Sequence, residues 1–285
     1  MSVLKLISGT LEDGARREAV YGGDLLVFEK VPPMQELCAF ADGMIRESFE
    51  TEDPVRAQFG MEREDYLSRV ERLQKRFRKD ETAKELFLAA LGHVGVDLGR
   101  TYWDPLYLRV SPHGGEHAGR RTATLGFHRD TWSSNVYAQT NWWAPIYPIS
   151  PGRTMAFYGE YWEKPLENTS AGWDLEEIRA GRSDVPLVPE PAETVSLASE
   201  LRPVIEPGDL LCFSGAHLHA SVPNTTGVAR FSVEARTADV EDAADGRGSP
   251  NLDGYAPRVP AGWFRHVRDG SPLPQAARVR PGGAV

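Results

Sequence analysis

The chain has 285 residues, of which 41% are hydrophobic and 26% are charged, enough for a substantial core in one large domain. Its 32 Lys and Arg against 41 Asp and Glu give a formal net charge of −9. This charge argues against binding to nucleic acid or to an anionic membrane surface, and weakly favours neutral or cationic small molecules. Two cysteines, Cys38 and Cys212, are too few for a disulfide framework. With no long apolar stretch, we expect a soluble, cytoplasmic enzyme or binding protein.

Residues 1–97 are expected to form a helical N-terminal part that begins with short strands. Strands are predicted from apolar runs, and helices from apolar residues that recur every three or four positions. The predicted strands and helices lie at 3–7, 25–28, 32–49 and, as two helices, 63–96. Thr82 and Glu85 have the spacing of a capping box at the start of the last helix.

From 98 to 240 the chain consists of short β-rich runs separated by Gly and Pro. The predicted strands lie at 106–110, 122–127, 139–147, 153–158, 210–214 and 229–236. Without helices between them, these runs favour an antiparallel sandwich or jelly roll, and hence a mainly β protein with N-terminal helices (α+β). A polar insertion at 165–203 contains one predicted short helix at 174–180. The Gly- and Pro-rich residues 241–285 are expected to form a C-terminal arm of the same single domain.

Histidine and aspartate side chains gather at the ends of two predicted strands. His128 and Asp130 are two residues apart, and residues i and i+2 of a strand point to one face, where both side chains can reach one metal ion. His217 and His219 follow the second strand and share a face in the same way, so either can supply the next ligand. Two histidines and one carboxylate leave positions open on the metal, as in non-heme Fe(II) oxygenases.

Arg230 and Ser232 follow on the next predicted strand and face the same side of it. A guanidinium binds a carboxylate through two parallel hydrogen bonds and keeps its proton, and each such bond contributes about 1.5–3 kcal/mol. A dicarboxylate such as 2-oxoglutarate would therefore chelate the metal at one end and contact Arg230 at the other. By strand parity, Tyr107 and Asn141 are expected to face the remaining part of this cosubstrate.

Three spaced motifs together resemble the Fe(II)/2-oxoglutarate-dependent oxygenases of the phytanoyl-CoA dioxygenase-like superfamily. They are His-x-Asp at 128–130, His-Ala-Ser-Val-Pro-Asn at 219–224 and Arg-x-Ser at 230–232. The intervals also fit, at 219 − 130 = 89 and 230 − 219 = 11 residues. The resemblance covers roughly residues 128–232. It implies a double-stranded β-helix core (a cupin-like jelly roll), with Fe(II), 2-oxoglutarate and O2 as cofactor and cosubstrates.

Carried onto this sequence, the resemblance implies three iron ligands that are also the catalytic residues: His128, Asp130 and His219. It places the distal carboxylate of 2-oxoglutarate on Arg230 and Ser232. His219 is preferred over His217 because the family-like run begins at His219. Chlorinating relatives replace the carboxylate ligand with a small residue, so the presence of Asp130 favours hydroxylation, desaturation or oxidative ring closure over halogenation.

The substrate is expected to be a small molecule with an unactivated C–H bond, in natural-product biosynthesis such as that of aminoglycoside or oligosaccharide antibiotics. Trp132, Arg129 and Trp143 are the predicted substrate-binding residues, although tryptophans in a jelly roll also fill the core. The alternatives are an acyl thioester hydroxylase, a non-oxidative cupin-type isomerase or hydrolase, and a binding protein without activity. We expect a monomer or homodimer.

Overall fold

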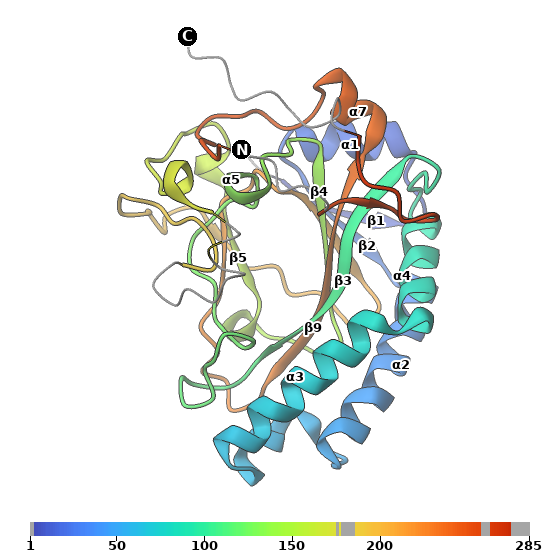
Figure 1. The fold of residues 1–285 in the computed structure, drawn as a ribbon, viewed down its shortest axis with the longest axis vertical. Coiled ribbons are helices and arrows are strands. Elements are labelled where there is room, and N and C mark those ends of the chain that lie inside the picture. Colours follow the sequence, from blue (N-terminus) through green and yellow to red (C-terminus); the bar gives the residue numbers. More distant parts are fainter. Residues whose placement is uncertain (1–2, 175–176, 178–185, 258–262, 275–285) are drawn as a thin grey trace.

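The structure, a computed structural model, describes residues 3–174, 177, 186–257 and 263–274 and combines helices with two β-sheets (Figure 1). The larger sheet has seven strands in the order β1-β2-β7-β4-β9-β3-β10, and the smaller has three in the order β6-β5-β8. The strands are β1 Leu4–Ser8, β2 Leu25–Glu29, β3 Thr101–Ser111, β4 Gln139–Pro145, β5 Met155–Tyr158, β6 Glu200–Leu201, β7 Leu210–Ser214, β8 His219–Ser221, β9 Arg230–Asp239 and β10 Arg265–His266. The predicted combination of helices and sheet is confirmed.

The first two strands, β1 and β2, pair in parallel. Two parallel neighbours need a crossover connection, and helix α1 (Asp13–Tyr21) supplies it. No helix was predicted between the strands at 3–7 and 25–28, so α1 was missed. The helix begins at Glu12, whose carboxylate accepts a hydrogen bond from the Ala15 amide at 2.8 Å and so caps the first turn.

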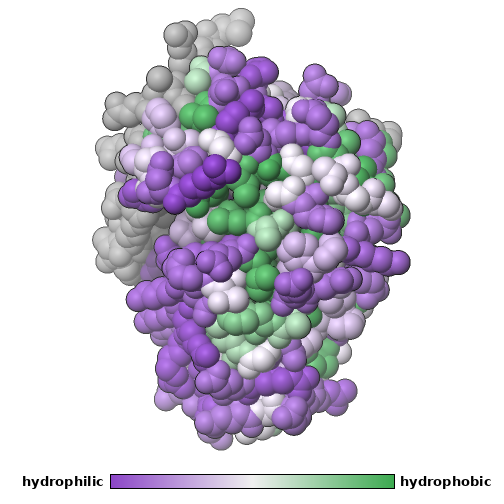
Figure 2. Space-filling model, turned by 90° about the vertical axis from the view of Figure 1, so that its right-hand side faces the viewer, coloured by the Kyte–Doolittle hydropathy of each residue, from purple (hydrophilic) through white to green (hydrophobic). Residues whose placement is uncertain are grey.

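Three helices cover one side of the β3–β9 pair (Figure 1). They are α2 (Pro32–Phe49), α3 (Arg63–Lys79) and α4 (Glu81–His93). Their apolar faces point inward, and Phe49 of α2 meets Phe231 of β9 edge-on with ring centroids 6.0 Å apart. Figure 2 shows this side from outside: the surface is mostly hydrophilic, with hydrophobic residues gathered in a band between hydrophilic ones.

The start of α4 differs from the predicted capping box. Asp80 is the N-cap, and its carboxylate accepts a hydrogen bond from the Ala83 amide at 3.0 Å. The helix therefore begins at Glu81, before Thr82, and the predicted cap formed by Thr82 and Glu85 is wrong. The prediction of two helices within 63–96 is confirmed.

Residues 122–127 do not form the predicted strand. The segment is held to β8 by an isolated bridge in which the amides of His128 and His219 each donate to the other residue's carbonyl at 3.0 Å. The Ser221 amide donates to the Leu125 carbonyl at 2.9 Å. Three residues on one side therefore span two on the other, and this extra residue prevents a regular ladder.

The longest strand pair, β3 with β9, brings distant polar residues opposite one another. The registered pairs run from Thr101 opposite Asp239 to Ser111 opposite Arg230, with one irregularity between Asp104 and Tyr107. Because side chains alternate along a strand, Arg230, Glu234 and Arg236 of β9 face the same side of the sheet. That side looks toward the smaller sheet (Figure 1).

Part of the predicted C-terminal arm is tied to the core. Helix α7 (Val240–Asp245) begins at Asp239, and β10 pairs with β3. Farther along the arm, the buried Asp253 accepts hydrogen bonds from the Arg129 guanidinium at 3.2 Å and from the Trp132 indole at 2.7 Å. The helix predicted at 174–180 lies outside the described residues, apart from Asp174 and Glu177.

Replacing Asp253 with alanine is expected to lower the free energy of unfolding by about 3–5 kcal/mol, because Arg129 would be left as an unpaired buried cation. Chemical denaturation measures this loss. Replacing the exposed Asp269 with alanine is the matched control and should change stability by less than about 0.5 kcal/mol. A loss below about 1 kcal/mol for Asp253→Ala would show that the arm is not anchored through this residue.

Among the residues that the structure describes, no helix is both long enough and apolar enough to cross a lipid bilayer. Cys38 and Cys212 are both buried and carry free thiols.

Candidate metal centre and adjoining cavity

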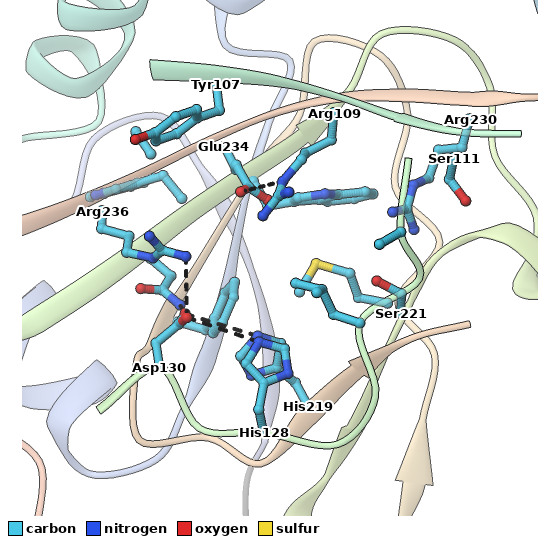
Figure 3. Close-up of a pocket in the computed structure, with 18 of the residues that line it drawn as sticks. Tyr107, Arg109, Ser111, His128, Asp130, His219, Ser221, Arg230, Glu234 and Arg236 are labelled. Carbon is cyan, nitrogen blue, oxygen red and sulfur yellow. Dashed lines mark hydrogen bonds and ion pairs between the residues drawn. The ribbon is translucent and has the colours of Figure 1, made fainter. Parts of the chain in front are cut away.

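Three buried side chains form a group with the geometry of a metal-binding site (Figure 3). The Nε2 atoms of His128 and His219 each lie 3.9 Å from an oxygen of Asp130, and the three donor atoms are all within 4.8 Å of one another. It is the one such group among the described residues. The structure thus brings together the three residues predicted as ligands.

His128 and Asp130 converge through a different backbone geometry from the strand that was predicted. His128 is held by its bridge to His219, whereas Asp130 has helical dihedral angles and starts the short helix α5 (Thr131–Ser134). Asp130 therefore reaches the site from a turn rather than from the same face of a strand. The prediction that the two residues converge is correct in outcome, but the predicted strand geometry is wrong.

Both imidazoles are oriented by backbone carbonyls behind them. The His128 Nδ1 lies 2.8 Å from the Gly126 carbonyl, and the His219 Nδ1 lies 3.0 Å from the His217 carbonyl. An Nδ1–H that donates to a carbonyl leaves a lone pair on Nε2 for a metal. Burial lowers the pKa of both groups, that of His219 to about 4, so both are neutral near pH 7.

Asp130 is held by two neighbours that orient its carboxylate. The Arg236 guanidinium lies 3.3 Å from Oδ1, and the Asn141 amide donates to Oδ2. Burial opposes ionisation, but Arg236, the two neighbouring histidines and the Asn141 hydrogen bond together hold the pKa of Asp130 below its usual range. Asn141, predicted to contact the cosubstrate, lines the cavity and positions this carboxylate.

The structure also separates the two histidines that the sequence left in competition. The His217 Nε2 lies 3.0 Å from the Gly23 carbonyl, and its ring packs on Trp162 with centroids 4.5 Å apart. Both ring nitrogens of His217 meet backbone carbonyls, the other being that of Ser214 at 3.2 Å. His217 is therefore a structural residue beside the site.

Substitution of the two histidines is expected to separate their roles. His219→Gln should weaken Mn(II) or Fe(II) binding by about 100-fold, whereas His217→Gln should change it by less than about 5-fold. Anaerobic titration followed by electron paramagnetic resonance with Mn(II) measures both affinities. Equal losses in the two variants would contradict the assignment of His219.

A cavity extends from the three donor side chains to Arg230 on the far side (Figure 3). Its lining is formed by the residues Tyr107, Arg109, Val110, Ser111, Arg121, Ala123, Leu125, His128, Asp130, Asn141, Trp142, Trp143, Met155, Phe213, His219, Ser221, Arg230, Glu234, Ala235 and Arg236. Tyr107 and Trp143, predicted for the cosubstrate and the substrate, both belong to it. The cavity is thus shared by the donor set and by several predicted contacts.

Arg230 is a buried cation without a carboxylate partner among the described residues. One terminal nitrogen donates to the Thr154 carbonyl at 2.9 Å, while its Nε has no hydrogen-bond partner. Burial lowers the pKa of Arg230 to about 10, so it stays protonated at neutral pH. In Figure 3, Ser111 and Ser221 lie beside its guanidinium. An unpaired buried guanidinium is costly to fold, which indicates a site for an anion.

Three other predicted contacts are placed away from the cavity lining. Ser232 is fully buried with no partner for its hydroxyl, and it is not among the lining residues. Trp132 is fully buried and donates to Asp253, and Arg129 is paired with the same carboxylate. The predicted substrate roles of Trp132 and Arg129 are therefore corrected: both join the arm to the core.

Several lining residues were missed by sequence reasoning. Arg109 donates to Glu234 at 2.7 Å, and Arg236 bridges Asp130 and Asp104. The signal was present in part, because Glu234 and Arg236 continue the alternation begun at Arg230. The pairing of Arg109 with Glu234 depends on the register of β3 against β9, which the sequence does not reveal.

Comparison with known proteins gives partial structural similarities at low sequence identity. No protein-family model and no curated protein matches the chain. Among solved structures, the non-heme alpha ketoglutarate dependent epimerase SnoN from nogalamycin biosynthesis is similar over 89% of this chain and 98% of its own, with 15% identity and a TM-score of 0.42. The non-heme monooxygenase ThoJ, in a nickel complex, is similar over 73% of this chain and 69% of its own, with 14% identity and a TM-score of 0.40.

A third similar structure, EvdO2 from Micromonospora carbonacea var. aurantiaca, covers 56% of this chain, with 14% identity and a TM-score of 0.37. The chain spans 59% of the length of EvdO2 and 31% of that of EvdMO1, another similar structure. Because the identities and TM-scores are this low, the chemistry of the site is inferred from the geometry of its own residues.

Proposed function

We propose that the chain is an Fe(II)- and 2-oxoglutarate-dependent oxygenase that oxidises an unactivated C–H bond of a small molecule. One observation carries the proposal: a buried group of two histidines and a carboxylate shares a cavity with Arg230, a buried cation that lacks an anionic partner among the described residues. A metal ion at one end and a guanidinium at the other match the two ends of a short dicarboxylate.

The donor set fits Fe(II). Two neutral imidazoles and one carboxylate on one side of the ion leave positions open for further ligands. With 2-oxoglutarate and O2, the bound iron supplies the oxidising chemistry, in which decarboxylation to succinate accompanies oxidation of the substrate. The chain's contribution is positional: backbone carbonyls orient His128 and His219, while Arg236 and Asn141 orient Asp130.

The far side of the cavity fits the distal carboxylate of 2-oxoglutarate. Arg230 offers charged donors, and the hydroxyls of Ser111 and Ser221 lie beside it (Figure 3). Low solvent exposure strengthens these hydrogen bonds. Ser232, which the family resemblance placed here, is buried on the same strand face but is not among the lining residues, so the proposed contact rests on Arg230.

We extend the proposal to the finer points of the family resemblance. The two sheets that flank the cavity are interpreted as the two halves of a double-stranded β-helix in one domain, as in phytanoyl-CoA dioxygenase-like oxygenases. The reaction is hydroxylation or oxidative ring closure in natural-product biosynthesis, carried out in the cytoplasm by a monomer or homodimer. A non-oxidative metalloenzyme with the same ligands would not need a buried guanidinium facing the metal.

Succinate formation tests this function. The Fe(II)-loaded chain should convert 2-oxoglutarate to succinate slowly in air, and a true substrate from a panel of natural-product precursors should accelerate it at least about 10-fold. The Asp130→Ala variant is the control and should lose both rates. Metal-dependent turnover of a panel compound without 2-oxoglutarate consumption would favour the non-oxidative alternative instead.

A further inference from the structure

The cavity carries a charge opposite to that of the whole chain. Four arginines are among its lining residues, Arg109, Arg121, Arg230 and Arg236, against two acidic residues, Asp130 and Glu234. The fixed charge is therefore 4 − 2 = +2, or +1 when Asp104 behind Arg236 is included, in a chain whose net charge is −9. A positive cavity in an acidic protein concentrates anions where they are bound.

Two of these cations already have their partners. Arg236 is held between Asp130 and Asp104, at 3.3 and 2.9 Å. Arg230 is assigned to 2-oxoglutarate, and to that extent the present inference rests on the proposed function. Fe(II) adds two positive charges and 2-oxoglutarate two negative ones, so loading both leaves the positive excess unchanged.

The other two cations retain unused donors. Arg109 donates to Glu234 through Nε at 2.7 Å, and its two terminal nitrogens have no acceptor among the described residues. Its side chain is 34% exposed, so the terminal nitrogens remain open to a ligand. Arg121 is 53% exposed, and the nearest carboxylate is that of Glu71 at 4.0 Å, which already binds Lys75 at 2.9 Å.

We propose that the substrate carries an oxyanion, a carboxylate or phosphoryl group, which is bound by Arg109 and drawn in by Arg121. The planar guanidinium of Arg109 binds such a group through two hydrogen bonds while Glu234 fixes its Nε. This reverses the preference for neutral or cationic substrates that the net charge suggested. The negative charges that dominate the total lie elsewhere on the molecule, whereas the substrate meets the local field of the cavity.

Paramagnetic line broadening in 31P spectra tests the proposal with three probes of similar size and different charge. They are methylphosphonate (anionic), trimethylphosphine oxide (neutral) and tetramethylphosphonium (cationic). The chain is loaded with Mn(II) and saturated with 2-oxoglutarate, so that Arg230 is occupied and only probes that enter the cavity approach the metal. The variants are Arg121→Gln, Arg109→Gln and both together. Arg56→Gln, at an arginine that is 67% exposed and outside the cavity lining, is the control.

Methylphosphonate should be broadened at least about 10-fold more than either other probe in the wild type and in Arg56→Gln. Arg121→Gln should reduce the broadening of methylphosphonate about 3-fold, and the double variant should reduce that broadening to the level of the neutral probe. Equal broadening of the three probes, or none, contradicts the proposal. So does anion broadening that is unchanged in the double variant, because it would mean direct binding to the metal.

Failure of the proposed function can be distinguished from failure of the oxyanion site. Mn(II) and 2-oxoglutarate binding are measured before the probes are added, and loss of either contradicts the oxygenase assignment alone. Calorimetric titration of the metal-free chain with methylphosphonate then compares the affinity of the wild type with that of the same variants. Dependence of its binding on Arg109 and Arg121 supports the oxyanion site, and its absence overturns that site. Because Arg121 is exposed, its single variant keeps the test available if Arg109→Gln fails to fold.

Discussion

Replacement of Asp130 by alanine is expected to weaken Fe(II) binding by at least about 100-fold and to abolish substrate-stimulated succinate formation. Asp130 supplies the one anionic donor of the site, and two neutral imidazoles hold a hard divalent cation poorly without it. Anaerobic titration of the variant with Fe(II), or with Mn(II) as a spectroscopic substitute, measures the affinity.

Glu234→Gln is the matched control for Asp130→Ala. Glu234 is a carboxylate that lines the same cavity but is paired with Arg109 and stands outside the donor set. Its variant should bind the metal within about 5-fold of the wild type. Metal affinity that survives in Asp130→Ala, or falls equally in both variants, contradicts the ligand assignment.

Arg230→Met is expected to weaken 2-oxoglutarate binding to the metal-loaded chain by about 100-fold or more, through the loss of two charge-assisted hydrogen bonds. The same substitution should leave the free energy of unfolding of the ligand-free chain unchanged, or raise it by about 1–2 kcal/mol. In the folded chain, Arg230 keeps a cation in a buried position with one backbone carbonyl as its hydrogen-bond partner. Removing the guanidinium therefore removes its desolvation cost in the folded chain, a cost that is offset only when 2-oxoglutarate binds.

Arg129→Met provides the opposite result at a second buried arginine. Arg129 is paired with Asp253 and donates to the carbonyls of Tyr161 and Lys164. Its loss should destabilise the chain by about 3–5 kcal/mol, because a buried carboxylate would be left unpaired. If Arg230→Met destabilised the chain as much as Arg129→Met, Arg230 would be a structural residue, and its assignment to the cosubstrate would be wrong.

Much of the site was predictable because its chemistry lies in short motifs. His128 and Asp130 at close spacing, followed by His219 and Arg230, combine residue types that few structural roles require together. The three donor residues converge as predicted, even though Asp130 arrives from a helical turn. Local periodicity likewise predicted the helix at 32–49, since its apolar face is fixed by spacing alone.

The errors arose where distant segments decide the role of a residue. Trp132 and Arg129 were assigned to the substrate because they flank Asp130, but Asp253, over 120 residues away, binds both of them. No local pattern reveals such a contact. The register of β3 against β9 similarly decides which carboxylate Arg109 meets. Net charge could not predict the proposed oxyanion site, because it sums over the whole chain, whereas that proposal rests on the arginines that line the cavity.

We infer that one 2-oxoglutarate molecule would contact both the metal and Arg230. Anaerobic titration of the Fe(II)-loaded chain with 2-oxoglutarate, followed by visible absorption, tests it most directly. We expect a charge-transfer band that saturates at about one equivalent in the wild type and requires at least about 100-fold more 2-oxoglutarate in Arg230→Met. Absence of the band in the iron-loaded wild type, or equal titrations in the two proteins, would contradict it.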